Sequence, residues 1–470
     1  MATQTTSARN SLESGEKETP FSSTAPSLYD DIEAQDHALP HRIPTHTPHD
    51  KEGAPLEISP SHLSQPPQPG VPDGGCMAWL QVACGFFMFF NSWGLINAFG
   101  VWQTYYTTTL LPSSSNSAIS WIGSLEAFLL CCSTVFLGPL FDRGHARALV
   151  RAGSCLLVLG LLMTSLCTTY WQLILAQGIC MGLGGGALFI VSVAIIPSYF
   201  STKRAFAIGI AASGSSLGGV IYPILFHRLQ PRIGFGWATR VIAFLALATL
   251  LLPCACIRTR PTTTPTRRKK LLDLSGFRER PFCLFCLAAF IGFLGLYVPF
   301  FYINEFGSEA AGLSPTLAFY LLPILSSGSI VGCILPSFIA DHAGPLNVLS
   351  ICTAVAGLLG FCWMAIHHTL SGLIVWALLY GAFSGAFVSL QPSTVVSITD
   401  DMGVVGGRLG INTFCAALGI LIGNPVAGII VGRGGWVGLQ AFCGGTLLAG
   451  AVLVMVTRWS RVGHGIREKA

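Results

Sequence analysis

The chain after Pro72 is a succession of apolar stretches of about 20 residues, separated by short polar connections. A stretch of that length is enough for one helix to cross ~30 Å of hydrocarbon. The pattern predicts an all-α integral membrane protein that crosses the lipid bilayer twelve times. We place the helices at 77–104, 119–141, 149–168, 171–197, 205–226, 236–257, 282–303, 314–340, 346–366, 371–396, 409–431 and 438–459.

The first 72 residues lack this pattern. They are rich in Ser, Thr, Pro and acidic residues and show no apolar periodicity. A segment of this kind cannot bury enough apolar surface to fold, so we expect 1–72 to be a disordered acidic cytosolic tail. No apolar stretch typical of a signal peptide lies near the first residue, and we expect the first helix to act as the insertion signal.

The composition supports the membrane assignment. Of the 470 residues, 52% are hydrophobic and 10% are charged, against roughly 25% charged residues in an average soluble domain. So few charges cannot cover the surface of a soluble fold of this size. The composition therefore excludes a water-soluble enzyme.

The charges are distributed unevenly along the chain. Residues 1–72 hold ten acids and four bases, whereas the remaining 398 residues hold 22 bases and 11 acids. The net charge of +5 is thus a sum of opposite regions, and it does not indicate a nucleic-acid partner. With the N-terminus in the cytosol, 18 bases fall in inner connections or the C-terminal tail, and three (Arg228, Arg232 and Arg433) fall outside.

This asymmetry follows the positive-inside rule and predicts that both termini are cytosolic. We expect the protein in the plasma membrane, with the vacuole or another endomembrane as the alternative.

A basic segment divides the twelve helices into two sets of six. Residues 258–281 carry eight bases and follow the sixth helix, so we interpret them as a cytosolic linker between six-helix halves at 73–257 and 282–460, with a cytosolic tail at 461–470. Two pairs of similar segments indicate that the second half is a duplicate of the first. GPLFDRG (138–144) corresponds to PSFIADHAG (336–344), and Gly214-xxx-Gly218 corresponds to Gly419-xxx-Gly423. Parallel six-helix repeats occur in several transporter folds.

These motifs resemble those of the major facilitator superfamily. GPLFDRGHAR (138–147) is similar to the signature loop of that family, in which the charged positions form a cytoplasmic gate. The resemblance implies two pseudo-symmetric six-helix halves that move a solute by alternating access. Its gate residues would be Asp142, Arg143 and Arg147, with Asp341 in the repeated loop.

Further segments resemble the fungal branch of the monocarboxylate-porter-like family. They are PDGG (72–75), YFSTKRAFAIGIAASGSSLGGVIYPIL (199–225), GSIVGCILPSFIADHAGPLN (328–347) and GGRLG (406–410). This resemblance implies a small organic substrate, often moved together with a proton.

Three cations that the family places inside its helices are missing here. Residues 77–106 contain no Lys or Arg, Cys333 takes the place of an Arg in the eighth helix, and Ile174 takes the place of an Arg in the fourth. A carboxylate at the middle of the bilayer needs a cationic partner. We therefore expect a larger neutral or amphipathic metabolite, recognised by aromatic and amide groups.

Polar and aromatic residues on the first, fourth, seventh and tenth helices are the candidates for binding the substrate. They are Asn91, Asn97, Gln177, Tyr297, Tyr302, Ser384 and Gln391. Buried amides also join helices to one another, so each of these residues has a structural alternative. Three glycines at helical spacing, Gly209, Gly214 and Gly218, allow close helix packing.

Two ionisable residues inside the spans are candidates for proton coupling or gating. Glu126 lies well within the second helix, where burial disfavours the charged form of a carboxyl group. The alternative role of Glu126 is that of a structural hydrogen-bonding residue.

Arg240 is either part of an outer gate or an arginine that extends its side chain to the membrane interface.

The sequence indicates neither a cofactor nor a metal site. Cys283 and Cys286 have the spacing of a metal or redox motif but lie in an apolar helix without a nearby His or a second Cys pair.

We predict a monomeric transporter of a small organic metabolite, with a slight preference for efflux of a secondary metabolite. Two alternatives stay open: an uptake carrier for a monocarboxylate or vitamin-like solute, and a nutrient sensor on the same scaffold. A membrane-embedded enzyme is disfavoured, because the sequence shows no cluster of His, Asp or Glu at one membrane face.

Overall fold

The computed structural model describes residues 73–114, 116–259, 274–366, 369–400 and 404–462. The predicted tail at 1–72, most of the predicted linker at 258–281 and the residues after 462 lie outside these ranges. The domain boundaries drawn at those segments therefore stay predictions.

The described residues form helices and contain no strand. In chain order the helices are α1 Cys76–Asn91, α2 Trp93–Asn97, α3 Phe99–Tyr105, η1 Tyr106–Leu110, α4 Asn116–Asp142, α5 Ala146–Thr164, α6 Tyr170–Leu173, η2 Ile174–Met181, α7 Gly182–Ala194, η3 Ile196–Ser198, α8 Arg204–Cys256, η4 Leu274–Arg278, α9 Arg280–Leu296, α10 Val298–Glu309, α11 Pro315–Ala343, α12 Pro345–Cys362, η5 Trp363–Ala365, α13 Leu370–Ser397 and α14 Val405–Val462.

Eleven segments of the described chain are long and apolar enough to cross a membrane. One of them is α8, whose 53 residues would extend ~80 Å as a straight helix, more than twice the hydrocarbon thickness. Gly234 interrupts α8 with φ 77° and ψ 167°, a conformation that glycine adopts at no steric cost. Gly435 interrupts α14 in the same way. Counting α8 as two spans gives the twelve helices that the apolar pattern predicts.

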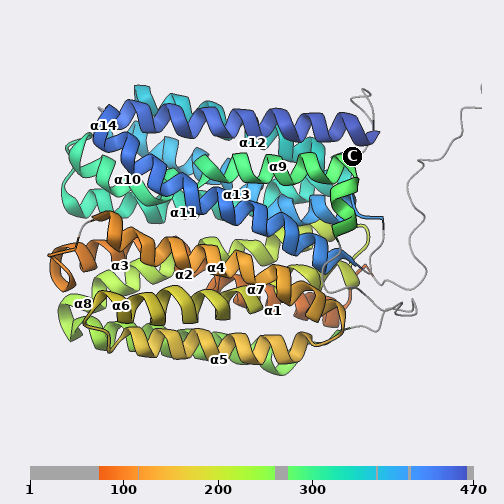
Figure 1. The fold of residues 1–470 in the computed structure, drawn as a ribbon, viewed down its shortest axis with the longest axis horizontal. Helices are drawn as coiled ribbons and strands as arrows, with labels where there is room; N and C mark the ends of the chain where they lie inside the picture. Colours follow the sequence, from red (N-terminus) through yellow and green to blue (C-terminus); the bar gives the residue numbers. More distant parts are fainter. Residues whose placement is uncertain (1–72, 115, 260–273, 367–368, 401–403, 463–470) are drawn as a thin grey trace, which may run out of the picture. The chain divides into compact units, whose positions relative to one another are not determined.

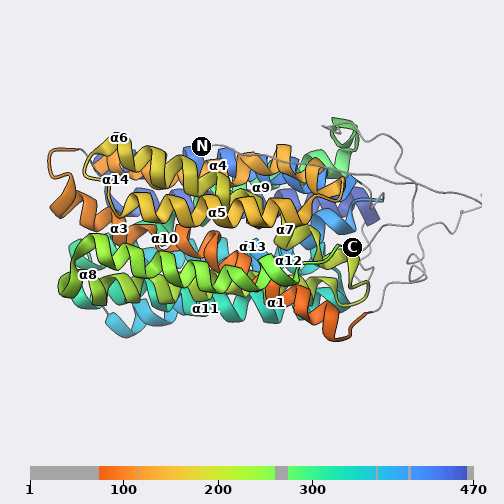
Figure 2. The same ribbon diagram turned by 90° about the horizontal axis from the view of Figure 1, so that it is seen from below.

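The helices lie in two groups. Figure 1 shows the helices of residues 76–256 in its lower part and those of 280–462 in its upper part, and we call them the first and second helix groups. The groups contact each other mainly where α8 packs against α11 and where α4 packs against α14. Figure 2 shows α8 and α11 side by side along their length.

The repeated glycine pairs make the same helix crossing in both groups. A Cβ atom on Gly214 or Gly218 of α8 would overlap the carbonyl oxygen of Phe86 or Phe90 on α1, respectively. On α14, Gly419 and Gly423 face the carbonyl oxygens of Phe290 and Leu294 in the same way. These pairs therefore fix helices within one group, whereas Gly209 packs across the groups, against Cys333 and Ser337 of α11.

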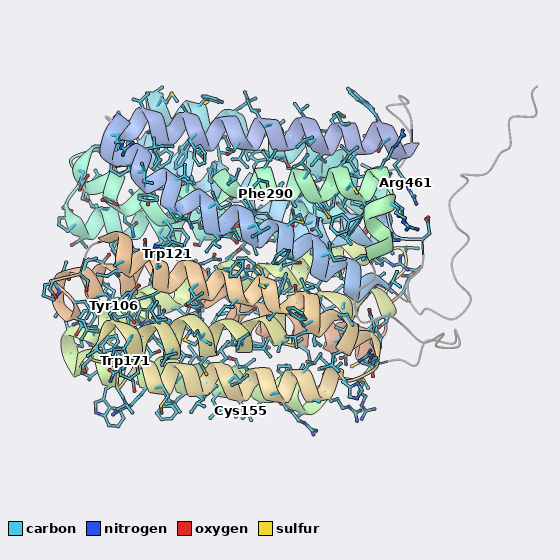
Figure 3. All side chains as sticks on the ribbon, in the orientation of Figure 1. Tyr106, Trp121, Cys155, Trp171, Phe290 and Arg461 are labelled. Atoms are coloured by element: carbon cyan, nitrogen blue, oxygen red, sulfur yellow. The ribbon has the colours of Figure 1, made fainter. Side chains whose placement is uncertain are left out.

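The outward faces suit a lipid environment. Large apolar side chains such as Phe136, Leu251 and Val452 are more than half exposed. Figure 3 places the exposed tryptophans Trp121 and Trp171 toward the end of the helices opposite to Arg461. Tryptophan is enriched at the interface between membrane and water. Arg461, Asp142 and Asp341 lie at the same end of the helices. We call this end the basic end, because the predicted inner connections there carry most of the Lys and Arg residues.

The glycine crossings predict a matched pair of variants. Gly214→Ala places a methyl group against the backbone of α1, and overpacking of this kind costs about 1–3 kcal/mol. Gly445→Ala is the control, because a Cβ there has no atom within 4 Å and alanine favours the helix. We expect a lower melting temperature for purified G214A and no loss for G445A. Equal melting temperatures of G214A and the wild type would show that the crossing of α1 and α8 accommodates the added methyl group without loss of stability.

Candidate transport site

A narrow cavity lies between the two helix groups. Its volume is about 20 Å³, room for about one water molecule, and it receives side chains from α2, α4 and α7 of the first group and from α9, α13 and α14 of the second. The residues in its wall are Trp93, Cys131, Phe189, Phe293, Val388, Gln391, Pro392, Leu409, Asn412, Thr413 and Ala416.

An aromatic layer forms one side of the cavity and joins the two groups. The Trp93 ring stacks on the Tyr297 ring with 5.6 Å between centroids, and Tyr297 stacks in turn on Phe293 at 5.9 Å. Phe189 meets the Trp93 ring edge-on at 5.8 Å. These rings give this side of the cavity an apolar, aromatic surface.

The described residues in the cavity wall carry no charge. Cys333, at the position where the resemblance leads one to expect an arginine, is buried next to the Gly385 carbonyl oxygen and the Ser216 hydroxyl. The site therefore offers aromatic rings, two amides and a hydroxyl group, but no cation for a carboxylate.

Two carboxylates link the groups at the basic end. Asp142, the last residue of α4, accepts a hydrogen bond of 3.2 Å from the Gly407 N–H in the first turn of α14. Asp341, near the end of α11, accepts hydrogen bonds of 2.8 and 3.0 Å from the N–H groups of Ala205 and Phe206 in the first turn of α8. Each acid thus occupies the positive end of a helix dipole that belongs to the other group.

A third carboxylate, that of Asp73 just before α1, is hydrogen-bonded to residues just before α8. Asp73 accepts hydrogen bonds from the N–H groups of Ser201 and Thr202, at 2.5 and 2.8 Å, and from the Ser201 hydroxyl at 3.0 Å. Burial opposes ionisation of this carboxyl group, but these hydrogen bonds outweigh burial and lower its pKa. Asp73 is therefore ionised at neutral pH.

Two arginines of the basic end, Arg147 and Arg408, make contacts within one group, whereas Arg204 at the start of α8 interacts electrostatically with Asp341 of the other group. Arg143 is exposed, and Arg147 donates a hydrogen bond of 3.2 Å to the Ile257 carbonyl oxygen after α8. Arg408 on α14 forms a bidentate ion pair with Glu279 before α9, with N–O distances of 2.5 and 2.9 Å. Among the predicted gate residues, it is thus Asp142 and Asp341 that join the two groups by hydrogen bonds.

The opposite end is also closed by contacts between α8 and α11. His227 stacks on Phe319 with 4.2 Å between ring centroids, and the Arg228 guanidinium donates a hydrogen bond of 3.3 Å to the Tyr320 hydroxyl. Contacts between the two groups are thus present at both ends of the helices. We interpret this arrangement as an occluded state.

Glu126 belongs to a buried polar network in the first group. Its side chain is 3% exposed and hydrogen-bonds to Gln177, whose amide oxygen accepts a 2.8 Å hydrogen bond from the Tyr106 hydroxyl. Tyr106 and Gln177 lie in the π-helical segments η1 and η2, a local geometry that is frequent at functional sites. One Glu126 oxygen, Oε2, is buried without a hydrogen-bond partner among the described residues.

The remaining predicted substrate residues lie outside the cavity wall. Asn91 is bonded to Thr249 and Tyr222 inside the first group, and Asn97 contacts the Ser215 carbonyl oxygen at 3.4 Å. Tyr302 donates to the Asn424 carbonyl oxygen, and Ser384 donates to the Gly381 carbonyl oxygen of its own helix. Of the seven predicted residues, Gln391 is in the wall and Tyr297 supports it by stacking on Trp93.

Arg240 lies apart from Glu126. Its Nε donates a 3.1 Å hydrogen bond to the Ser165 hydroxyl, and its guanidinium lies 4.9 Å from the centroid of the Trp237 ring. Among the described residues it forms no ion pair with an acid.

Sequence reasoning missed Trp93 and Asn412 as wall residues. Trp93 lies in an aromatic-rich stretch typical of helix packing, and Asn412 lies on a helix that we did not expect to line the cavity. An isolated amide within an apolar span was the available signal for Asn412.

Comparison with known proteins identifies the family. The family model described as Major Facilitator Superfamily matches residues 82–407. An MFS-type transporter of Emericella nidulans, dbaD, is 43% identical over 387 residues, which cover 82% of this chain and 86% of that protein. The chain belongs to the Major Facilitator Superfamily.

Other relatives in the Major Facilitator Superfamily are named for efflux. The aspyridones efflux protein apdF of Emericella nidulans is 36% identical, over 84% of this chain and 81% of its own. The agnestins efflux protein AgnL12 of Paecilomyces divaricatus is 37% identical, over 88% of this chain and 95% of its own. This member of the superfamily is therefore a multi-pass membrane transporter of small molecules.

Solved structures agree with the major facilitator fold. A crystal structure of the transporter FucP in the outward conformation aligns with a TM-score of 0.62 and 14% identity, covering 80% of this chain and 98% of that one. A crystal structure of the human organic anion transporter MFSD10 aligns with a TM-score of 0.61 and 15% identity over the same shares. Likeness at this level of identity concerns the fold alone.

Proposed function

We propose that this transporter exports a neutral organic secondary metabolite by alternating access, and that it belongs to the monocarboxylate-porter-like branch of its superfamily. The observation that carries the proposal is the cavity between the two helix groups, whose described wall residues include aromatic rings and amides but no charge. An anion held there would lose its hydration without gaining a cationic partner. A neutral cargo does not carry this cost.

The direction of transport is supported by the relatives. Two of them are named as efflux proteins for aspyridones and for agnestins. We place the basic end in the cytosol, in agreement with the positive-inside rule, and the protein in the plasma membrane as a monomer. The cargo then enters the cavity from the basic end and leaves at the opposite end.

The carboxylates Asp142 and Asp341 provide the inner gate in this mechanism. Each carboxylate at a helix N-terminus stabilises the closed end by about 0.3–1 kcal/mol, and up to ~2 kcal/mol when partly buried. Contacts of this size can be broken in each cycle, because a cargo that binds the closed state more tightly shifts the equilibrium by a similar free energy. Loading from the cytosol requires that both pairs of contacts open.

Glu126 is our candidate for the proton site. It is buried beside Gln177 and has an unpartnered oxygen among the described residues. A protonated carboxyl group can remain in this environment, whereas an ionised one lacks a cation there. Proton binding at Glu126 would therefore depend on its hydrogen bond with Gln177.

Export is tested by deleting the gene in the producing fungus and comparing metabolites in the medium and in the cells. We expect at least one neutral secondary metabolite to accumulate in the cells, and re-expression of the wild-type chain to restore its release. Unchanged distribution of every metabolite would contradict export.

The neutral cargo is tested by expressing the protein in a transporter-null host. We expect no saturable, pH-dependent uptake of lactate there, and such uptake would contradict the neutral cargo.

Proton coupling is tested with Glu126→Gln in the same export assay. We expect release of the metabolite to lose its dependence on external pH, because glutamine has the shape of the acid but cannot take up the proton. Glu309→Gln, at the exposed end of α10, is the control and should keep the wild-type pH dependence. A wild-type pH profile in E126Q would remove Glu126 from the proton pathway.

A further inference from the structure

Two unpartnered N–H donors belong to side chains that line the cavity from opposite helix groups. The indole Nε1 of Trp93 and the amide Nε2 of Gln391 are buried without a hydrogen-bond partner among the described residues. Their side chains are 3% and 7% exposed, respectively. A buried donor without an acceptor is costly, and the cost is recovered when a ligand supplies the acceptor.

Several similar side chains elsewhere in the described chain are paired, although the Trp363 Nε1, outside the cavity wall, is also buried without a partner. The Trp376 Nε1 donates a 2.7 Å hydrogen bond to the Leu359 carbonyl oxygen. The Gln440 Nε2 donates to the Trp363 carbonyl oxygen at 3.4 Å, and the Gln81 Nε2 donates to the Cys256 carbonyl oxygen at 3.2 Å. These helices can therefore satisfy a buried tryptophan or glutamine donor, and Trp93 and Gln391 differ from the unpaired Trp363 in that both belong to the cavity wall, one from each helix group.

From these observations we infer that Trp93 and Gln391 bind carbonyl oxygens of a flat, neutral, conjugated cargo. This inference rests on the proposed transport function and specifies the cargo. The Trp93, Phe189 and Phe293 rings in the wall give a ring system apolar, aromatic neighbours. The two unpartnered atoms of the wall are donors, so a cargo that pairs with them supplies acceptors, and the absence of charge in the described wall favours a neutral molecule.

The same two residues couple cargo binding to the conformational cycle. Trp93 is on α2 of the first group and Gln391 is on α13 of the second. A cargo that accepts a hydrogen bond from each bridges the groups, and this bridge can form only while the groups are close together. The occluded state is then the state that binds cargo best, although the narrow cavity has to widen to admit it.

A matched pair of probes tests the inference without knowledge of the natural cargo. The ketone 9-fluorenone and the hydrocarbon fluorene are flat tricyclic molecules that differ in one carbonyl group, and 9-fluorenone-2-carboxylate adds a negative charge. Binding to the full-length protein in lipid nanodiscs is measured by equilibrium dialysis, with empty nanodiscs subtracted. We expect fluorenone to bind about tenfold more tightly than both fluorene and the carboxylate, as expected for one satisfied buried donor.

The variants Trp93→Phe and Gln391→Met remove one donor each, and they put a smaller aromatic ring and an apolar chain of similar length, respectively, in its place. We expect at least one of them to lose the roughly tenfold preference for fluorenone over fluorene, because the single carbonyl oxygen of fluorenone accounts for one satisfied donor. Trp376→Phe and Gln440→Met make the same chemical changes outside the cavity wall and should keep the preference for fluorenone. Q391M should melt no lower than the wild type, because it removes an unpaired group, whereas W93F loses packing against Tyr297 and Phe189 and the two controls each lose a hydrogen bond.

Equal binding of fluorenone and fluorene to the wild type would overturn the inference, as would a preference that survives in both W93F and Q391M. Binding of the carboxylate as tight as that of fluorenone would overturn the neutral cargo. These failures are distinct from failure of the proposed function, because export from fungal cells is measured with natural metabolites. A protein that exports but shows no fluorenone preference contradicts only the assignment of Trp93 and Gln391.

Discussion

The transport mechanism depends on a contact between the two helix groups, in which a carboxylate of one group binds the N-terminus of a helix of the other. It occurs twice at the basic end: Asp142 meets the first turn of α14, and Asp341 meets the first turn of α8. The acid binds backbone N–H groups, which every sequence provides, so the geometry is set by where the helices begin. Such contacts contribute at most about 2 kcal/mol each. They are strong enough to favour one state and weak enough to be reversed by a bound cargo.

The packing inside each group is of a different kind. Gly214 and Gly218 hold α8 against the backbone of α1, and Gly419 and Gly423 hold α14 against α9 by the same crossing. Close packing of this type favours movement of each group as a unit. Hydrogen bonds and ring stacking join the groups, and so do close glycine contacts, in which Gly209, Gly138 and Gly410 lie against backbone carbonyl oxygens of the other group. Alternating access requires these contacts between the groups to open at one end at a time.

Much of this fold could be predicted from the apolar pattern. The twelve spans follow from the length of each stretch, and the Gly-xxx-Gly echo predicted a repeated feature that the structure places at equivalent crossings. The cavity could not be predicted in the same way. Asn91 and Gln391 are both buried amides in apolar spans, yet Asn91 is bonded to Tyr222 and Thr249 within its group, and Gln391 faces the cavity unpaired. The rotation of a helix about its axis decides between these roles, and a span that is apolar all round does not specify it.

The accessibility of the native Cys131 thiol tests the gate most directly. Cys131 lines the cavity and is fully buried in this state, so a charged, water-soluble methanethiosulfonate reagent should not reach it in the wild-type protein. The double variant Asp142→Asn/Asp341→Asn should open the basic end and increase labelling of Cys131, quantified by peptide mass spectrometry. Asp400→Asn is the control, because Asp400 pairs with Arg461 within the second group. Cys131 labelling in the double variant as low as in the wild type and D400N would contradict the account.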